Sequence, residues 1–238
     1  VPINTPASAR RMIKDLIQTH GSAYPEGQAL LHRLNGVEKR LQANPANKQA
    51  RAALDQLIRT AALENPLLDF DRILVIRRTK EANRNLNSHT TDTIKRTGWD
   101  NEITELSNLR GQVRTRTVYR HSNQSVMKHM NLHFSGERVM FSGVGKNGNW
   151  AVLEVDTQGR QLRELTPDDQ DDVQWFDGCY LPEEPYILTC STAGMQGLPC
   201  ENGGKPMVNL YRANTRTKQV RQLTFEQDSD WHPQVPPD

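Results

Sequence analysis

The chain has 238 residues, 35% of them hydrophobic and 24% charged, which is the composition of a globular protein with a sizeable core and not of a disordered chain. Its 30 Lys and Arg residues against 28 Asp and Glu residues leave a formal net charge of +2, too little to predict a nucleic-acid partner. No run approaches the roughly 18 consecutive apolar residues of a membrane helix, so no membrane span is expected.

The first 65 residues are predicted to form a helical N-terminal segment of three short helices. Apolar side chains recur at helical spacing, for example at Met12, Ile13, Leu16 and Ile17. Breaks are expected at residues 21–25 and 44–45, because a proline pushes the residue before it out of the helical region. Asn65 and the proline after it end the last helix.

From residue 66 onward the pattern changes to strands. Residues 72–77 form a short β-branched run with charged flanks, which predicts a buried strand. Residues 79–101 are rich in Asn, Thr and Ser and predict a long loop.

An internal repeat organises the second half of the chain. Residues 150–166 align without a gap to residues 208–224, at a constant offset of 58, and each copy is a strand, a polar turn and a strand that ends in Leu-Thr. The preceding hairpin, residues 134–142, recurs at an offset of about 48. The second copy therefore has about ten extra residues, which must lie between Cys190 and Val208.

A repeat of about 48 residues with two hairpins has the size of a four-stranded propeller blade, and residues 101–119 suggest a degenerate earlier copy. The sequence thus predicts a mainly β fold: a partial, truncated β-propeller over residues 66–238, with two to three blades, preceded by the short all-α segment. Because closed propellers have about four to eight blades, remaining blades or a partner chain are expected to cover the open strand edges.

Several short sequence motifs resemble those of TolB-like propeller repeats. They resemble more closely those of the family that carries the middle domain of the hydrazine synthase alpha subunit. They occur in the same order as in that family, at residues 65–75, 98–103, 131–134, 165–173, 177–182 and 222–231. The resemblance covers roughly residues 65–238. It implies a propeller of about six blades in a large extracytoplasmic bacterial protein, periplasmic or secreted, in a family whose activity is mostly uncharacterised.

The resemblance does not imply that this chain binds a haem. Attachment of a c-type haem needs Cys-x-x-Cys-His, and the three cysteines, Cys179, Cys190 and Cys200, are not spaced in that way. A haem would have to be bound by residues beyond 238. The chain also departs from the family at Gly194, where members often have a cysteine.

The metal-ligand candidates lie in and after an acidic stretch, and they are Asp172, Asp177, Cys179 and Cys200. Mixed thiolate and carboxylate ligands suit zinc, and carboxylates alone suit calcium. The alternative is that the aspartates cap turns, because no fixed ligand spacing such as that of an EF-hand is present.

The sequence also contains a histidine pair and a cysteine pair that could act together. His129 and His133 are four residues apart, which separates them by about 13 Å along a strand, so they are not expected to chelate together. Cys190 and Cys200 flank the insertion and could form a disulfide in an oxidising compartment. The alternative for these cysteines is a free, buried thiol.

The binding candidates are Met195 and Gln196 in the insertion, with Asp230, Trp231 and His232 on the funnel of the ring. No haem-attachment, catalytic-triad or nucleotide motif is present. The sequence therefore favours a non-catalytic propeller segment that binds an unknown ligand or a protein. The alternative is the platform part of a redox or metal-dependent enzyme whose haem or catalytic residues lie beyond residue 238.

Overall fold

The computed structural model describes residues 4–79, 95–121 and 124–235. The chain folds into two compact units, one made of Val1–Ile73 with Leu106–Arg114 and the other of Leu74–Glu105 with Thr115–Asp238. Helices come first and strands follow, so the mainly β fold with a helical N-terminal segment is confirmed. Along the described residues, none of the helices has the length and apolar character needed to cross a membrane.

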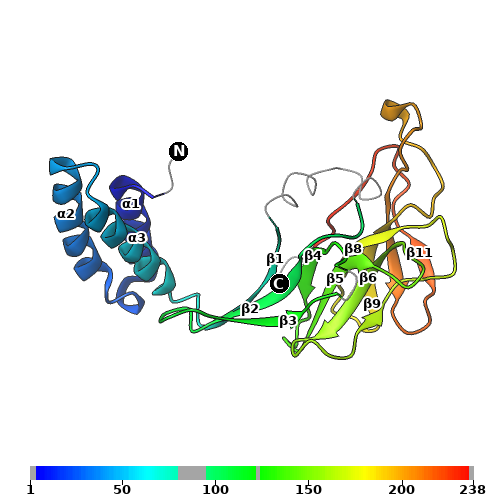
Figure 1. Ribbon diagram of the computed structural model, residues 1–238, viewed down its shortest axis with the longest axis horizontal. Coiled ribbons are helices and arrows are strands. Elements are labelled where there is room, and N and C mark those ends of the chain that lie inside the picture. The colour runs from blue at the N-terminus through cyan, green and yellow to red at the C-terminus, as the bar shows by residue number, and fades with distance from the viewer. Residues whose placement is uncertain (1–3, 80–94, 122–123, 236–238) are drawn as a thin grey trace. The chain divides into compact units, whose positions relative to one another are not determined.

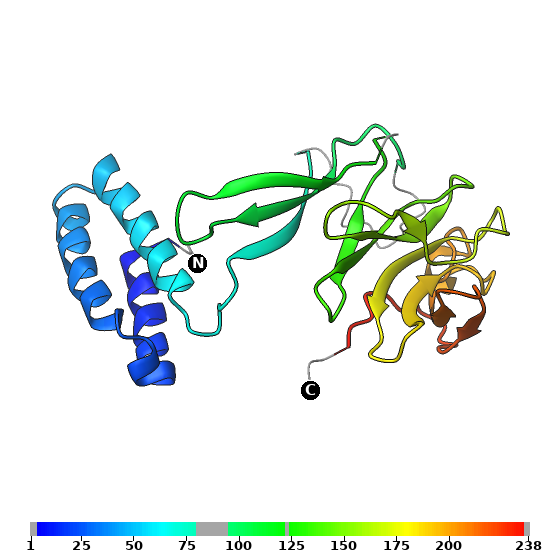
Figure 2. The same cartoon turned by 90° about the horizontal axis from the view of Figure 1, so that it is seen from below.

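Three helices of the first unit pack side by side (Figure 2): α1 (Pro6–His20), α2 (Gly27–Ala43) and α3 (Lys48–Leu63). The Thr5 hydroxyl accepts a hydrogen bond from the backbone N–H of Ser8, and the Ser8 hydroxyl accepts one from Thr5, which is a capping box at the start of α1. Asn47 caps α3 through its side-chain oxygen. A short 3-10 helix, η1 (Gly21–Ala23), separates α1 from α2, where the break was predicted.

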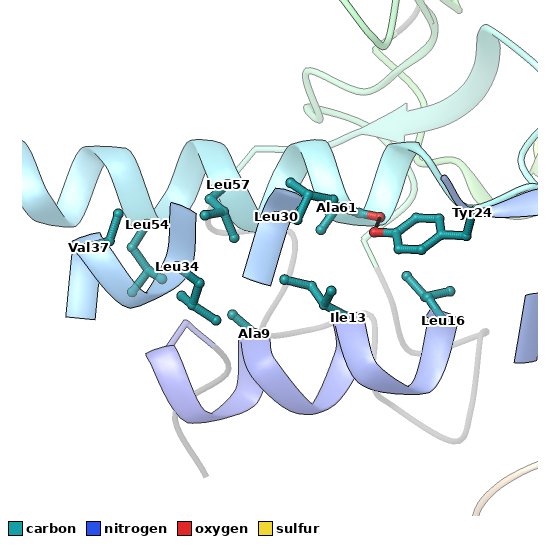
Figure 3. Packing of buried hydrophobic residues seen from close by; sticks show 10 residues of the cluster. All are labelled: Ala9, Ile13, Leu16, Tyr24, Leu30, Leu34, Val37, Leu54, Leu57 and Ala61. Atoms are coloured by element: carbon teal, nitrogen blue, oxygen red, sulfur yellow. Dashed lines mark hydrogen bonds between the residues drawn. The ribbon is translucent and has the colours of Figure 1, made fainter. Parts of the chain in front are cut away.

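The helices enclose their own core, shown in Figure 3. Its buried members come from all three helices and the turn after η1: Ala9, Ile13, Leu16, Tyr24, Leu30, Leu34, Val37, Leu54, Leu57 and Ala61. Tyr24 is the only polar member, and its hydroxyl donates to the Ala61 carbonyl at 3.0 Å. The buried tyrosine is therefore satisfied, as a buried polar group must be.

The first sheet has three strands in the order β1-β2-β3: β1 (Arg72–Arg77), β2 (Glu102–Ser107) and β3 (Arg114–Tyr119). The predicted strand at residues 72–77 exists, but its inner residues are only half-buried. Among the described residues, the suspected repeat copy at residues 101–119 supplies two strands of this three-stranded sheet. Most of the predicted loop at residues 79–101 lies outside the described residues.

Two four-stranded antiparallel sheets follow, and Figure 1 labels most of their strands. We call them the first and second blades. The first is β4 (Lys128–Leu132), β5 (Arg138–Val144), β6 (Trp150–Asp156) and β7 (Arg163–Glu164). The second is β8 (Trp175–Tyr180), β9 (Tyr186–Ser191), β10 (Asn209–Asn214) and β11 (Val220–Gln222).

Equivalent strands keep the offsets that the sequence predicted. β5 and β9 begin 48 residues apart, at Arg138 and Tyr186, and β6 and β10 end 58 residues apart, at Asp156 and Asn214. The insertion lies between β9 and β10 and contains a short 3-10 helix, η3 (Pro199–Glu201). The two-hairpin repeat is therefore a structural unit.

The two blades pack face to face through apolar side chains of both: Met140, Val152 and Leu165 from the first, and Tyr180, Ile187 and Ala213 from the second. Gly178 lies at this contact. A Cβ on Gly178 would come within 2.7 Å of the Met140 sulfur and of a Val152 methyl. A side chain at Gly178, next to Asp177, would therefore force one of these groups to shift.

Candidate metal centre

The first strand of each blade contains a β-bulge. β4 shifts its register against β5 between Lys128 and Asn131, and β8 shifts against β9 between Phe176 and Cys179. A bulge places an extra residue on one strand and turns its side chain away from the regular alternation. Both blades therefore redirect side chains at equivalent places.

His129 and Asp177 are the residues in these bulges, and they lie 48 residues apart, at equivalent positions of the repeat. Both have positive φ angles, 46° and 52°, and His232, which follows the second blade, has a φ of 55°. Residues other than glycine rarely adopt this conformation, which costs about 1–3 kcal/mol and clusters at functional sites.

The three side chains converge, and we call them the His–Asp–His cluster. One potential ligand atom of each lies within 4.8 Å of the others. His129 Nδ1 contacts Asp177 Oδ1, and His232 Nδ1 lies 3.4 Å from Asp177 Oδ2. The imidazole rings meet edge to face, with centroids 4.1 Å apart.

The carboxylate at the centre is buried, with 3% of its side chain exposed, against 25% for His129 and 52% for His232. Its backbone is held by a hydrogen bond from the Asp177 N–H to Ser142 Oγ at 2.8 Å. His129 Nδ1 and Asp177 Oδ1 are buried, and although they touch, neither makes a hydrogen bond of acceptable geometry. Buried polar atoms normally have a partner, and these two atoms are therefore available to bind a ligand.

Electrostatics favour the ligating form of the histidine. Burial lowers the pKa of His129, although the Asp177 carboxylate opposes this effect. A neutral imidazole at neutral pH is the form that binds a metal ion. The nearby Cys190 thiol remains protonated, because burial raises its pKa strongly while the backbone N–H of His232 acts in the opposite direction.

The donor set fits a borderline transition metal. Two imidazoles and one carboxylate bind zinc at about 2.0–2.2 Å, and the same set holds Fe(II) in non-haem sites. Bonds of that length place tetrahedral ligands roughly 3.4 Å apart. The His232–Asp177 separation of 3.4 Å has this size, whereas His129 Nδ1 and Asp177 Oδ1 are in direct contact and would have to move apart to admit an ion. Calcium prefers oxygen ligands alone and fits poorly.

Of the predicted metal ligands, only Asp177 joins this cluster. Cys179 is buried in β8, where burial raises its pKa to about 11. Asp172 is exposed, and Cys200 is exposed on η3. Within the described ranges no other set of His, Cys, Asp and Glu side chains converges in this way, so the mixed thiolate and carboxylate site is not formed.

Cys190 and Cys200, the predicted disulfide pair, are both free thiols in the structure. The reason lies in their surroundings. Cys190 packs in the core beside Trp150, Phe176 and Val208, whereas Cys200 is exposed to solvent. The insertion holds its shape instead through backbone contacts such as the bridge between Gly197 and Pro206.

The predicted binding residues separate into two places. Met195 and Gln196 line an open groove of about 440 Å³ together with Asp172 and Lys205. Residues 230–232 lie elsewhere: the Asp230 N–H donates to the Val208 carbonyl, which brings His232 to the cluster. Trp231 beside it is 37% exposed.

Sequence reasoning missed His129. Sequence spacing relates His129 only to His133, and His133 lies 3.0 Å from the Glu184 carboxylate. The available signal was the 48-residue offset, which aligns His129 with Asp177 once it is extended to the first strand of the blade.

Comparison with known proteins supports the fold. No protein-family model matches the chain, and no curated protein matches it. Among solved structures it is similar to hydrazine synthase from Kuenenia stuttgartiensis, with a TM-score of 0.52 and 15% identity over 71% of this chain and 26% of that one. This likeness supports a β-propeller fold.

Two TolB structures are also similar. TolB from Acinetobacter baumannii has a TM-score of 0.35 and 19% identity, over 53% of this chain and 27% of that chain. A putative TolB from Agrobacterium tumefaciens has a TM-score of 0.40 and 16% identity, over 56% and 41%. The chain spans less than half the length of each of these proteins.

Proposed function

We propose that this chain is a binding segment of β-propeller type that holds one divalent transition-metal ion between two blades. The observation that carries the proposal is the convergence of His129, Asp177 and His232 from three separate segments. Zn²⁺ is the ion we expect, and Fe²⁺ is the alternative that the same donors allow.

The local structure supports a metal more than an ordinary buried ion pair. An Asp–His pair needs one hydrogen bond, whereas here both contacting atoms lack one. A metal ion would satisfy both atoms at once. A metal site would also explain why the two β-bulges and the three residues with positive φ angles lie together.

A second candidate function is that this chain forms the metal-binding part of a metal-dependent enzyme. Three protein ligands leave at least one coordination position open, which is typical of catalytic zinc and not of closed structural zinc. Displacement of a metal-bound water by an added ligand would favour this candidate. A fully coordinated ion would favour the non-catalytic binding segment.

We also propose that further blades or a partner chain cover the outer surface of the second blade. β11 is a strand at the edge of its sheet, and Leu223 and Phe225 beside it are 41% and 75% exposed. Edge strands and apolar patches of this kind are normally covered. An extracytoplasmic location, periplasmic or secreted, is part of the same proposal and is supported by the TolB-like fold.

Isothermal titration of the metal-free chain with Zn²⁺ tests the metal proposal. We expect one Zn²⁺ per chain, with Ca²⁺ binding far more weakly. Asp177→Asn and His129→Ala should weaken Zn²⁺ binding at least about 100-fold, more than the loss typical of an outer-shell partner. His32→Ala is the matched control, because His32 is exposed on α2.

The proposal fails if the unaltered chain binds no stoichiometric Zn²⁺. It also fails if the cluster variants bind Zn²⁺ as tightly as the control. Far-UV circular dichroism of each variant separates loss of the site from loss of the fold.

A further inference from the structure

Residues 229–235, which follow the second blade, repeat contacts that lie between the first blade and the second. The backbone N–H of Trp150, at the start of β6, donates to the side-chain oxygen of Gln174 at 2.9 Å. Its counterpart in the second blade is Val208, whose backbone N–H donates to the Ser229 hydroxyl at 3.1 Å. Donor and acceptor are 24 residues apart in the first case and 21 in the second. The segment after each blade is therefore held in the same way.

His232 has the place in this segment that Asp177 has in β8. Asp177 lies three residues after Gln174, and His232 lies three residues after Ser229. Both have a positive φ, 52° and 55°. Because Asp177 is the counterpart of His129 in the first blade, the three ligands occupy one repeat position in three successive units.

The neighbours of this repeat position agree as well. The backbone N–H of Asp177 donates to Ser142 Oγ in the preceding blade at 2.8 Å. Cys190 is the residue 48 positions after Ser142, and the backbone N–H of His232 acts on its thiol. In both cases a residue of one blade holds the ligand position of the next.

The outer face of the second blade also continues the repeat. The first blade buries three side chains completely against the second: Met140, Val152 and Leu165. At the offsets of 48 and 58, their counterparts in the second blade are Leu188, Leu210 and Leu223. The first two of these are half-buried, and Leu223 is 41% exposed. This apolar face corresponds to the one on which a blade packs, so a further blade fits it better than an unrelated partner.

We propose that residues 229–235 begin a third blade, which packs on this face, and that the metal ion binds one side chain from each of three successive blades. The inference rests on the proposed metal site. His129 and Asp177 lie in strands, whereas His232 lies on a segment outside the strands. An ion bound to all three side chains stabilises only the arrangement in which this segment is docked. The metal ion therefore holds the start of the third blade against the first two.

Hydrogen–deuterium exchange of the full chain tests the role of the metal ion. With saturating Zn²⁺, amide exchange in residues 229–235 should slow by at least about tenfold, because opening of the segment then requires loss of a ligand. His232→Ala should weaken Zn²⁺ binding at least about 100-fold and abolish this protection. Gln234→Ala is the matched control, because Gln234 is exposed in the same segment. It should leave both the affinity and the protection unchanged.

Cysteine labelling tests the third blade in the protein expressed from its complete gene. Leu223→Cys places a thiol on the outer face of the second blade, and the exposed Cys200 is the internal control. We expect the new thiol to react with a maleimide at least about tenfold more slowly than Cys200, because reactivity requires exposure. Peptide mass spectrometry distinguishes the two sites.

The outcomes separate the two proposals. If Zn²⁺ does not bind, the metal site and the link between three blades both fail. If Zn²⁺ binds but exchange in residues 229–235 is unchanged, or His232→Ala binds Zn²⁺ as tightly as Gln234→Ala, only the link is overturned. Labelling of Leu223→Cys as fast as Cys200 overturns the third blade. Exchange in the unaltered chain decides the role of the metal ion if His232→Ala does not fold.

Discussion

Glu102 is a carboxylate buried at the start of β2, with four side-chain partners. Arg77 and Arg120 donate to it at 2.7 and 2.6 Å, and the hydroxyls of Thr104 and Thr117 donate at 2.9 and 3.0 Å. Burial raises the pKa of Glu102, but these hydrogen bonds outweigh burial and lower the pKa to about 2. The ionised form is therefore the one that the fold stabilises.

The second unit should consequently lose stability in acid. Because the folded pKa of Glu102 is below the unfolded one, its contribution is complete above about pH 4.5 and falls as the pH drops towards 2. Glu102→Gln should lower the free energy of unfolding by about 3 kcal/mol at pH 7 and flatten its pH dependence in that range. Urea unfolding at several pH values measures this effect, with the exposed Glu137→Gln as the control. If the free energy of unfolding depends on pH equally in both variants, Glu102 is not the group that makes the fold sensitive to acid.

Gly178 lies in the bulge of β8. A Cβ there would lie 2.7 Å from Met140 and Val152, so the strand would have to move away from the first blade. We expect Gly178→Ala to cost about 1–3 kcal/mol of stability and to weaken Zn²⁺ binding, because Asp177 moves with it. Thermal unfolding and Zn²⁺ titration check both effects. A stable variant with unchanged affinity would show that the bulge does not position Asp177.

Two other glycines should respond in opposite directions. Gly36 lies inside α2 with no atom near its missing Cβ, so Gly36→Ala should stabilise the helical unit by about 0.5–1 kcal/mol. Gly159 has a φ of +81° in the turn after β6, and a Cβ would come within 1.7 Å of the Val118 carbonyl oxygen. Gly159→Ala should therefore lower the melting temperature of the second unit. Differential scanning calorimetry distinguishes a rise from a fall.

At the scale of the whole molecule, the two units have separate cores. Every buried member of the helical core lies between residues 9 and 61, and the clusters of the blades contain none of them. Leu34 is fully buried in the helical core. Leu34→Ala should destabilise the helical unit by about 2–5 kcal/mol and leave Zn²⁺ affinity unchanged.

Circular dichroism at 222 nm follows the helical transition, and tryptophan fluorescence follows the blades, because the described tryptophans all lie after residue 98. Zn²⁺ should raise the melting temperature of the transition that tryptophan fluorescence reports and leave that of the helical transition unchanged, since a ligand stabilises the folded unit that binds it. A shift of both transitions by Leu34→Ala or by Zn²⁺ would show that the units unfold together.

Much of the fold was predictable from the sequence alone. Helical spacing and proline breaks are local signals, and the repeat offsets of 48 and 58 gave the strands of both blades and the insertion between β9 and β10. The size of the first sheet was not predictable, because residues 101–119 resemble a blade locally, yet they pair with β1 in a three-stranded sheet.

The site was decided by tertiary structure. The sequence predicts Asp177 as a metal ligand and His232 as a binding residue, and it predicts no ligand role for His129. What unites them is a pair of bulges and a backbone hydrogen bond from Asp230 to Val208, which bring residues 48 and 55 positions apart to one point. Periodicity determines which residues form strands. Only the packing of one blade on the next decides which side chains meet.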